Sequence, residues 1–476
     1  MFGRCYRPAA TATRVRSGIA TEPTTITNYD GGVVTHPQRV VRPRTVEEIQ
    51  AVLRDRDQYP GPVRPMGSFH SLTPCVSTDG TVVDMTGMDR ILAIDGQAMT
   101  LTAQAGVQQI QAARALRRQD LQFVLNIEIG NLTLGSAACC QTKDALDCVE
   151  FGQISSYVTR IKWVTPAGEL REASADEDPE LLHFVRSSYG LCGIVYEVDF
   201  RIKPLEMVRF DYAVHDVDDL TQDHISAVIA SNQSMVCWTV GRTTVVQTRN
   251  RTTDLRLQWV AGLRRRGWNH IGSYLGKKIR RYAPTPAVRD ILDEGLYLFQ
   301  KASYRSLSAV GGFSLYAPDK TVNYDKTLPS ARYAFTFWTF PRSEWVANLK
   351  AYLEFRDRHF QQYGFRCNLP LGSYYIKHDT SSVLSYSHDG DTISLDPIHA
   401  PAESDQAQWE FFLQEFNAWA HQRGGIPLLN QSPFVERQHV VSAYGDRWTR
   451  FSAWVRAEDP EGRMLSPFFA DLLSDG

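Results

Sequence analysis

The stretch from Pro62 to Ser71 limits what this chain can fold into more than any other. A short apolar strand, Pro62 to Met66, runs directly into the loop Gly67-Ser68-Phe69-His70-Ser71. Glycine lets a backbone turn or approach a ligand closely, and successive backbone N–H groups in a loop can form a concave anion site. A loop histidine taken alone is more often a surface residue, so the neighbouring stretches decide whether this loop binds a cofactor.

Length and composition limit the number of domains and the class of protein. A chain of 476 residues is too long for one ordinary core, which predicts two domains. Its 43% hydrophobic and 22% charged residues are globular values. The net charge of -2 argues against a nucleic-acid partner, and no apolar run is long enough to predict a membrane span.

The first residues are basic, with Arg4, Arg7, Arg14 and Arg16 and no acidic residue before Glu22. They predict a flexible N-terminal tail, residues 1–22, with a transit segment as the alternative. Eight cysteines without a Cys-x-x-Cys pair favour neither a disulfide scaffold nor a zinc site. We therefore expect a reducing, cytoplasmic setting.

Two further stretches that contain glycine follow along the chain. The first contains Gly130, Asn131, Thr133, Gly135, Ser136 and Ala138, and indicates either a flat ligand or tight helix packing. The second is Gly190-Leu191-Cys192-Gly193-Ile194-Val195, followed by a strand. No Gly-x-Gly-x-x-Gly occurs, so a Rossmann site is not predicted.

Taken together, these stretches resemble the FAD-binding PCMH-type proteins, the vanillyl-alcohol-oxidase family, and are most similar to its sugar-lactone and alditol oxidase branch. The matching positions are Gly67, His70, Ser71, Thr78, Asp79, Gly80, Met85, Met88, Asp89 and Leu92. A second match is the tail Asp459-Pro460-x-Gly462.

The resemblance implies an α+β fold in three parts. A two-subdomain FAD-binding PCMH-type domain is expected at residues 23–205, and a mixed α/β substrate (cap) domain at 206–435. The C-terminal segment, 436–476, is expected to return to the FAD domain. Within the cap, residues 331–340 carry aromatic side chains on alternate positions, which predicts one strand.

The resemblance also implies FAD as cofactor, bonded covalently through His70. The expected cofactor-binding residues are Met66, Gly67, Ser68, Phe69, His70, Ser71, Gly130, Asn131, Thr133, Gly135, Ser136, Ala138, Gly190, Gly193, Ile194 and Val195. Phe69 stands where the family usually has glycine. Asn131 stands where one subgroup has a second, cysteine anchor, so a single covalent link is expected.

The substrate half departs from the family pattern. Its Glu-x-Arg motif aligns with Asn368-Leu369-Pro370, and its His-Trp-x-Lys motif aligns with residues 428–431, Leu-Leu-Asn-Gln. A polyol needs many polar partners, so this loss predicts a less polar substrate. The candidate catalytic residues are Asn368, Tyr374, Tyr375, His399 and Gln431; strand alternation allows only one of the two tyrosines to face the flavin.

The sequence thus predicts an FAD-dependent oxidase that takes hydride from a CH–OH or CH–NH centre and passes electrons to O2. A dehydrogenase with another electron acceptor is the first alternative. A metal-assisted hydrolase or lyase using His378, His388 and His399 is a second, although their spacing matches no local metal motif. A third is a binding module with a basic helix face at residues 255–268 and 276–281, for which a solvated charged face is the simpler interpretation.

Overall fold

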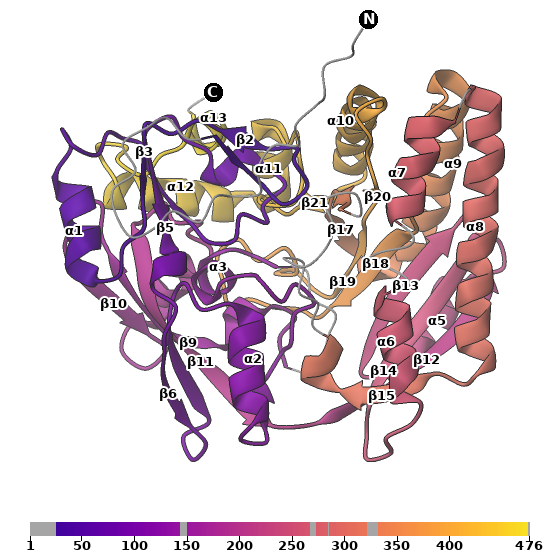
Figure 1. Cartoon of the computed structure of the whole chain (residues 1–476), viewed down its shortest axis with the longest axis horizontal. Helices are drawn as coiled ribbons and strands as arrows, with labels where there is room; N and C mark the ends of the chain where they lie inside the picture. The colour runs from indigo at the N-terminus through magenta and orange to yellow at the C-terminus, as the bar shows by residue number, and fades with distance from the viewer. Residues whose placement is uncertain (1–24, 143–149, 267–272, 284, 321–331, 475–476) are drawn as a thin grey trace, which may run out of the picture.

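A computed structural model describes residues 25–142, 150–266, 273–283, 285–320 and 332–474 (Figure 1). The predicted N-terminal tail, residues 1–22, lies outside this range. Two lobes lie side by side, with the chain passing from one to the other between β11 (Ile194–Pro204) and β12 (Met207–Asp216). No helix in the described ranges is both long and apolar enough to cross a bilayer.

The first subdomain is a small parallel sheet. Its strand order is β3 (Arg39–Val41), β5 (Thr81–Asp84), β4 (Val63–Met66). Helix α1 (Val46–Arg54) connects β3 to β4 and begins with the capping box that Thr45 and Glu48 predict. Ligands in parallel sheets bind beyond the carboxyl ends of the strands, and Gly67 follows the carboxyl end of β4.

The second subdomain is an antiparallel sheet in the order β10-β9-β11-β7-β6, with β8 also paired to β11. The strands are β6 (Ile91–Asp95), β7 (Thr100–Gln104), β8 (Leu121–Phe123), β9 (Val158–Val164) and β10 (Leu170–Ser174). Three helices accompany it: α2 (Gln109–Arg117), α3 (Leu134–Cys139) and α4 (Pro179–Val185). The two sheets together confirm the expected two-subdomain arrangement.

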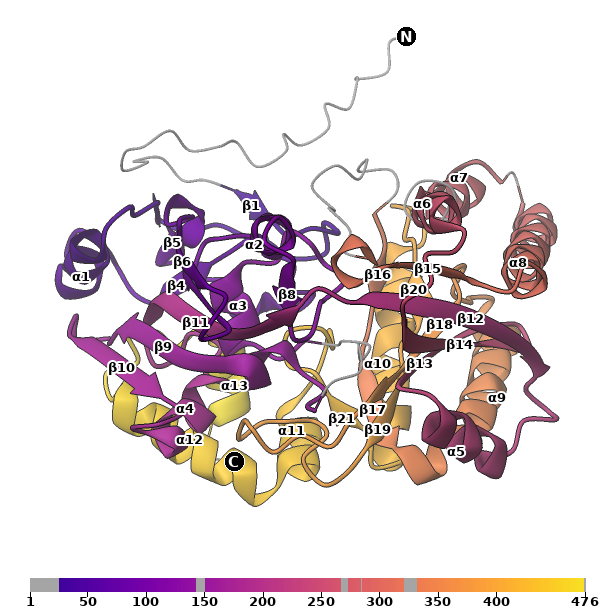
Figure 2. The ribbon, with the colours of Figure 1, turned by 90° about the horizontal axis from the view of Figure 1, so that it is seen from below.

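The second lobe contains an eight-stranded sheet in the order β15-β12-β14-β13-β18-β19-β17-β21. Its remaining strands are β13 (Ser234–Val240), β14 (Thr243–Thr252), β15 (Phe313–Tyr316), β17 (Trp338–Pro341), β18 (Leu371–Ile376), β19 (Thr392–Leu395) and β21 (Ile426–Pro427). Helices α6 (Gln258–Arg266), α7 (Ser273–Tyr282) and α8 (Pro286–Ala309) lie on one side, and α5 (Gln222–Ser231) and α9 (Trp345–Tyr363) on the other (Figure 2). Helix α10 (Gln406–Gln422) packs on α9 through aromatic contacts.

The single strand predicted for residues 331–340 is wrong. The described part forms two short strands in different sheets: β16 (Ala334–Phe335) pairs with β20 (Ile398–His399), whereas β17 joins the large sheet. Alternating aromatic residues suit any extended segment, and pairing partners far along the chain decide where the segment divides.

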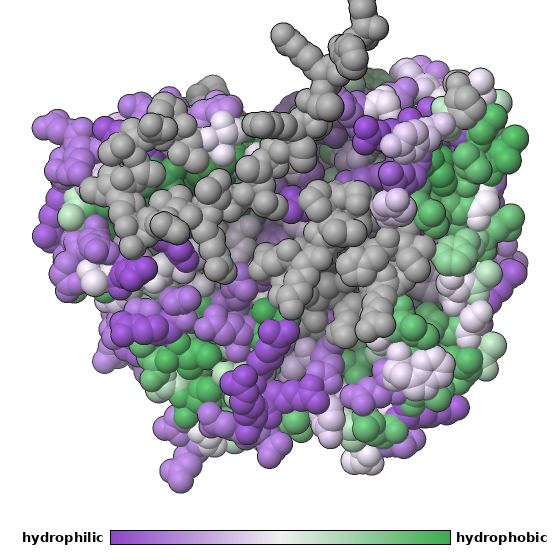
Figure 3. Space-filling view, in the orientation of Figure 1, coloured by the Kyte–Doolittle hydropathy of each residue, from purple (hydrophilic) through white to green (hydrophobic). Residues whose placement is uncertain are grey.

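The basic stretch of the cap is not a uniformly solvated charged face. Burial lowers the pKa of Lys277 on α7 to about 8, although the Asp30 carboxylate opposes that shift. Lys278 lies over the ring of Tyr274. Apolar side chains are exposed on the neighbouring helices, including Trp259 on α6 and Ile291 on α8. Figure 3 shows hydrophobic surface over α8.

The C-terminal segment returns to the first lobe, as the resemblance implies. It forms α11 (Arg437–Tyr444), α12 (Asp446–Glu458) and α13 (Pro467–Leu473), drawn in yellow beside the indigo strands. The turn between α12 and α13 joins the edge of β4, because the N–H of Val63 donates to the Arg463 carbonyl at 2.8 Å. The Asp459 carboxylate shapes this turn by accepting from the backbone N–H groups of Arg463 and Met464.

Arg64 fastens the cofactor loop region to this tail. Its side chain is fully buried on β4, and no carboxylate pairs with it in the described structure. Instead, Nη1 donates to the Met464 carbonyl at 2.7 Å and to the Gly190 carbonyl at 3.3 Å. Nη2 donates to the Tyr189 carbonyl at 2.6 Å and to the Cys75 carbonyl at 3.0 Å. One side chain therefore holds three distant segments against β4.

Replacing Arg64 should loosen the contact between β4 and the three segments whose carbonyls it binds. Arg64→Met removes donors from four carbonyls, and leaving buried acceptors unpaired costs about 1–3 kcal/mol each, so we expect destabilisation of about 3 kcal/mol or more. Thermal unfolding measures this loss of stability. Arg56→Met is the matched control: its exposed ion pair with Glu461 also links the first lobe to the tail, but exposed pairs contribute about 1 kcal/mol or less. Equal effects from both variants would contradict the role given to Arg64.

Candidate active site

A large cavity lies between the first lobe and the cap sheet in the part of the chain that the structure describes. It holds about 2140 Å³, including the part open to solvent. Residues from the β4 loop, α3 and the Gly190–Val195 segment line one part. Strands β12, β13, β15 and β18 of the cap line the other. The cavity is therefore lined by residues of both lobes.

The loop after β4 is held from several sides. The Ser68 hydroxyl donates to the Asn131 carbonyl, and the Phe69 carbonyl accepts from the N–H of Tyr29 at 3.1 Å. The Tyr29 ring stacks on the His70 imidazole, with 4.9 Å between centroids. All six residues from Met66 to Ser71 line the cavity. The imidazole is thus positioned by a ring contact and by the backbone on either side of it.

Two residues of this loop show why the pattern favours small side chains. A Cβ on Gly67 would lie 2.2 Å from the Thr133 hydroxyl, so only glycine lets the loop approach α3 this closely. Phe69 has a φ of 51°, in the left-handed region. This conformation costs a non-glycine residue about 1–2 kcal/mol, which gives a physical reason for the glycine that similar sequences carry there.

The other two predicted cofactor stretches meet at the same cavity, but not with every residue. Thr133, Gly135, Ser136, Gly190, Gly193 and Val195 line it. Gly130, Asn131, Ala138 and Ile194 do not, and the last two are fully buried in the core behind it. Gly135 also serves tight packing, because a Cβ there would lie 2.7 Å from that of Ala105. Both interpretations of the small residues apply: α3 packs closely and borders the cavity.

The cap side of the cavity is largely apolar. Its lining includes Phe210, Trp238, Phe313, Leu315, Tyr333, Phe335, Tyr374 and Ile398. Tyr374 contacts Trp238 edge to face at 6.0 Å. Tyr375, its neighbour on β18, does not line the cavity, and its hydroxyl donates to Asp391 at 2.8 Å. Alternation along the strand thus places one tyrosine toward the cavity and one away from it.

The remaining candidate catalytic residues do not all lie at the cavity. Gln431 lines the cavity and is buried. Asn368 and His399 do not line it; they form a buried cluster with Asp405 instead. His399 Nδ1 accepts from the N–H of Asn368 at 3.3 Å, so its proton is on Nε2, which donates to Asp405 at 3.1 Å. Asp405 and Asn368 thus occupy both ring nitrogens of this histidine.

Burial governs the ionisation of the cavity tyrosine. Desolvation raises the pKa of Tyr374 well above its ordinary value, and the Glu128 and Asp396 carboxylates raise it further, while Arg249 opposes them. Tyr374 is therefore a neutral phenol at working pH. It can donate a hydrogen bond to a ligand in the cavity, but it does not serve as a tyrosinate base.

A carboxylate–guanidinium pair at the cavity escaped the sequence analysis. Glu128, from the segment between β8 and α3, lines the cavity and accepts from Nη2 of Arg249 on β14 at 3.0 Å. The Arg249 side chain is fully buried, whereas that of Glu128 is 30% exposed. The only signal was one acidic residue in an apolar stretch, Ile127-Glu128-Ile129. Its partner lies 121 positions away.

The three histidines of the metal alternative have separate partners. His378 Nε2 contacts the His388 carbonyl, His388 pairs with Asp389, and His399 pairs with Asp405. In the part of the chain that the structure describes, no group of three or more histidine, cysteine or acidic residues is arranged to hold a metal ion.

The sequence matches one known domain family and several known proteins, each over part of its length. Residues 37–174 match the FAD binding domain family. The chain is 28% identical over 180 residues to an L-gulono-1,4-lactone dehydrogenase of Mycobacterium tuberculosis, which covers 37% of this chain and 40% of that protein. It is 25% identical over 201 residues to the mitochondrial L-galactono-1,4-lactone dehydrogenase of Brassica oleracea (42% and 33%). It is 23% identical over 192 residues to the L-gulonolactone oxidase of Bos taurus (40% and 43%). The chain thus spans 33–43% of the length of these relatives.

Comparison with solved structures covers the whole chain. A cholesterol oxidase from B. sterolicum superposes with a TM-score of 0.74 over 98% of this chain and all of that one, at 14% identity. A solvent-stable cholesterol oxidase gives 0.72 over 98%, at 16% identity. The fold of both lobes is therefore that of a PCMH-type FAD protein, as the sequence predicts.

A substitution at Gly193 tests how closely two backbone segments approach each other in the cavity wall. It has a φ of +133°, and a Cβ would lie 2.1 Å from the Val164 carbonyl oxygen. We expect Gly193→Ala to destabilise the protein by about 3 kcal/mol or more, combining backbone strain with a clash, and to lower the amount of FAD per chain in the purified protein. Gly364→Ala is the control: its φ is +68° with open space around it, so about 1 kcal/mol is expected. Similar losses in both variants would count against the close approach.

Proposed function

We propose that this protein is an FAD-dependent oxidoreductase of the oxidase type, because residues 37–174 match the FAD binding domain family. It removes hydride from a CH–OH or CH–NH centre of a moderately apolar small molecule. The FAD is bonded covalently through His70, and electrons pass from it to O2. The sequence relatives are lactone oxidases and dehydrogenases, and both classes oxidise a substrate.

The continuous cavity is the observation that carries this proposal. The loop Met66–Ser71 and the Gly190–Val195 segment line it on one side, and the aromatic cap strands line it on the other. A cofactor held by the loop would thus face a substrate held by the strands. The predominantly apolar lining offers few partners for a polyol, because each substrate hydroxyl buried without a partner weakens binding.

The residues of the first lobe suit FAD. Backbone at Gly67, Gly135 and Gly193 leaves no room for side chains, so the main chain itself forms the wall, as a flat, charged cofactor requires. Bound FAD supplies an acceptor for two electrons and a hydrogen. The cap excludes water around it, and Tyr374 donates a hydrogen bond that orients the substrate oxygen. Gln431 borders the same space and fixes the polar end of the substrate.

A dehydrogenase is the second candidate, and the relatives favour it as much as an oxidase, because they include both kinds of enzyme. The two differ only in the electron acceptor. Oxygen uptake measured beside reduction of an artificial dye separates them once a substrate is known.

A substrate panel tests the proposal. Anaerobic bleaching of the bound flavin reports hydride transfer directly, with no need for an acceptor. We expect cyclohexanol, 1-octanol, benzyl alcohol or benzylamine to bleach it at least tenfold faster than L-gulono-1,4-lactone or xylitol, since about 1.4 kcal/mol in binding corresponds to a factor of ten. Faster bleaching by the lactone or the alditol would reject the apolar substrate. No bleaching by any member would reject the proposed reaction.

The covalent link has its own test. Acid precipitation releases a flavin that is held by loop contacts and retains one bonded to the chain. We expect yellow colour in the wild-type pellet, and colour only in the supernatant for His70→Ala. His36→Ala is the control, because this exposed histidine lies far along the chain and outside the cavity lining. Release of the flavin from the wild-type protein would show that no covalent bond exists.

A further inference from the structure

We propose that Glu128 accepts the proton of the substrate hydroxyl, and that Arg249 is the positioning residue that holds its carboxylate. This inference rests on the proposed function, because it assigns the missing base of that reaction. The two residues come from different lobes: Glu128 precedes α3, and Arg249 lies on β14 of the cap sheet. They replace, at new positions, the charged pair that the cap strand lacks at Asn368-Leu369-Pro370.

Position favours Glu128 as the base. Its carboxylate borders the same cavity as His70 and the aromatic wall of the cap, and its side chain remains 30% exposed although Arg249 is completely covered. One carboxylate oxygen, Oε1, accepts from the guanidinium at 3.0 Å. The arrangement holds a carboxylate at the cavity surface by a partner behind it, and carboxylates are effective proton acceptors when so placed.

The other titratable groups of the cavity are less suited to this task. Desolvation raises the pKa of Tyr374, which keeps it protonated. His70 is assigned to the flavin bond. Asp319, the second carboxylate of the lining, forms an ion pair with Arg117 of the first lobe. Lys320 is a cation and offers no lone pair until it loses its proton. Glu128 is the carboxylate that faces the aromatic substrate wall.

Arg249 is built to hold a single anion. It lies in the middle of the cap sheet, since β14 pairs with both β12 and β13. Its guanidinium covers the Phe210 ring at 5.0 Å, and Phe210 itself lines the cavity. Nε and Nη1 are buried without an acceptor from the described residues. A buried cation with one carboxylate partner strongly favours the ionised form of that partner.

Arg249 on β14 pairs directly with Glu128, and Tyr374 on β18 is close enough for the Glu128 charge to act on its hydroxyl. In the reaction, the substrate O–H proton passes to the Glu128 carboxylate while the C–H bond breaks and its hydrogen and electron pair leave as hydride for oxidised FAD. The substrate carbon–oxygen bond becomes a carbonyl, and Glu128 becomes a neutral carboxyl that returns its proton to solvent. The rate of flavin reduction therefore needs ionised Glu128 and falls on the acid side.

The pH profile of anaerobic flavin reduction tests this assignment, with whichever of cyclohexanol, 1-octanol and benzyl alcohol reduces the wild-type flavin fastest. General-base catalysis contributes about 10²–10⁴-fold, so we expect Glu128→Gln to lose at least 100-fold and to have no acid limb. Glu128→Asp should recover part of the rate and keep the limb. Arg249→Met should shift the limb to higher pH, because the cation no longer favours the carboxylate, and Arg249→Lys should shift it less.

A second readout needs no turnover. Phenol has a hydroxyl but no hydrogen on the carbinol position, so it binds without reacting, and its binding can be followed in the flavin absorbance. A hydrogen bond to a charged group contributes about 1.5–3 kcal/mol. We therefore expect Glu128→Gln to weaken phenol binding about tenfold or more. The acid-stable flavin content and the unfolding temperature should stay near the wild-type values in the double variant Glu128→Gln/Arg249→Met, which leaves no buried charge unpaired.

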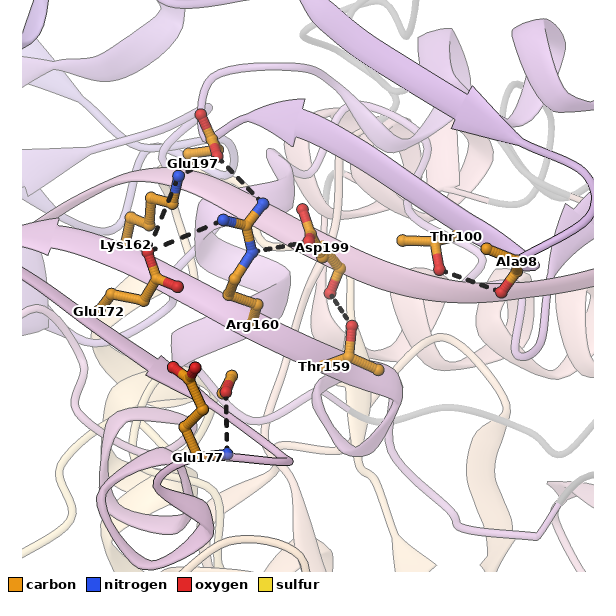
Figure 4. A network of polar contacts seen from close by, with 10 residues as sticks. Ala98, Thr100, Thr159, Arg160, Lys162, Glu172, Glu177, Glu197 and Asp199 are labelled. Atoms are coloured by element: carbon orange, nitrogen blue, oxygen red, sulfur yellow. Dashed lines mark hydrogen bonds and ion pairs between the residues drawn. The ribbon is translucent and has the colours of Figure 1, made fainter.

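The chain offers a matched control in the first lobe. Glu197 on β11 also pairs with an arginine, Arg160 on β9 at 3.3 Å, and with Lys162 at 2.9 Å, and its side chain is 18% exposed. Figure 4 shows this network, in which Arg160 also contacts Asp199 and Glu172. Glu197 does not line the cavity. Glu197→Gln should leave the reduction rate, its pH profile and phenol binding unchanged.

The outcomes separate this inference from the proposed function. If no alcohol reduces the wild-type flavin, the proposed function fails. If the wild type is reduced and folded Glu128→Gln keeps both its rate and its acid limb, the proposed base is wrong while the reaction stands. Loss of the limb in Tyr374→Phe, with the limb retained in Glu128→Gln, would transfer the role to the tyrosine and overturn the inference.

Discussion

The buried guanidinium of Arg64 holds the C-terminal tail against the N-terminal sheet of the first lobe. Four carbonyls from the Cys75 turn, the Tyr189–Gly190 turn and the C-terminal tail converge on it. Burial removes the water that solvates a cation, and here carbonyl dipoles take the place of that water. The carbonyls can do so only if each of their segments is held in one place. Since β4 carries Arg64 and ends at Gly67, the same contact fixes where the cofactor loop begins.

The cavity is formed by surfaces of different chemical character. Its first-lobe side consists of backbone and small residues, and its cap side of aromatic rings. The closest approaches, at Gly67 and Gly193, are enforced by contacts with Thr133 and Val164 rather than by the cofactor itself. The cap has no charged pair on β18, and the pair that borders the cavity, Glu128 with Arg249, spans the two lobes. Docking the lobes therefore assembles the charge that the proposed chemistry uses.

The features of the fold that depend on nearby residues could be predicted from the sequence. Those that depend on contacts between distant residues could not. The strand that delivers the cofactor loop appears where the sequence predicts it, and α1 begins with a capping box formed by Thr45 and Glu48. These features depend on neighbours within a few residues. The single strand expected at residues 331–340 divides because β16 and β17 find partners more than fifty residues away. Within the basic helix stretch of the cap, Lys277 is partly buried, which also depends on contacts distant in the sequence.

For the candidate site, the sequence by itself determined which residue types occupy the loop and that Tyr374 and Tyr375 point to opposite faces, because a strand alternates whatever it packs against. Only the tertiary structure decided which tyrosine borders the cavity, since that depends on which side of the cap sheet meets the first lobe. It also decided that Asn368 and His399 turn to Asp405 rather than to the cavity. The pairing of Glu128 with Arg249 could not be read from the chain, because a contact across 121 residues exists only once both lobes are folded and docked.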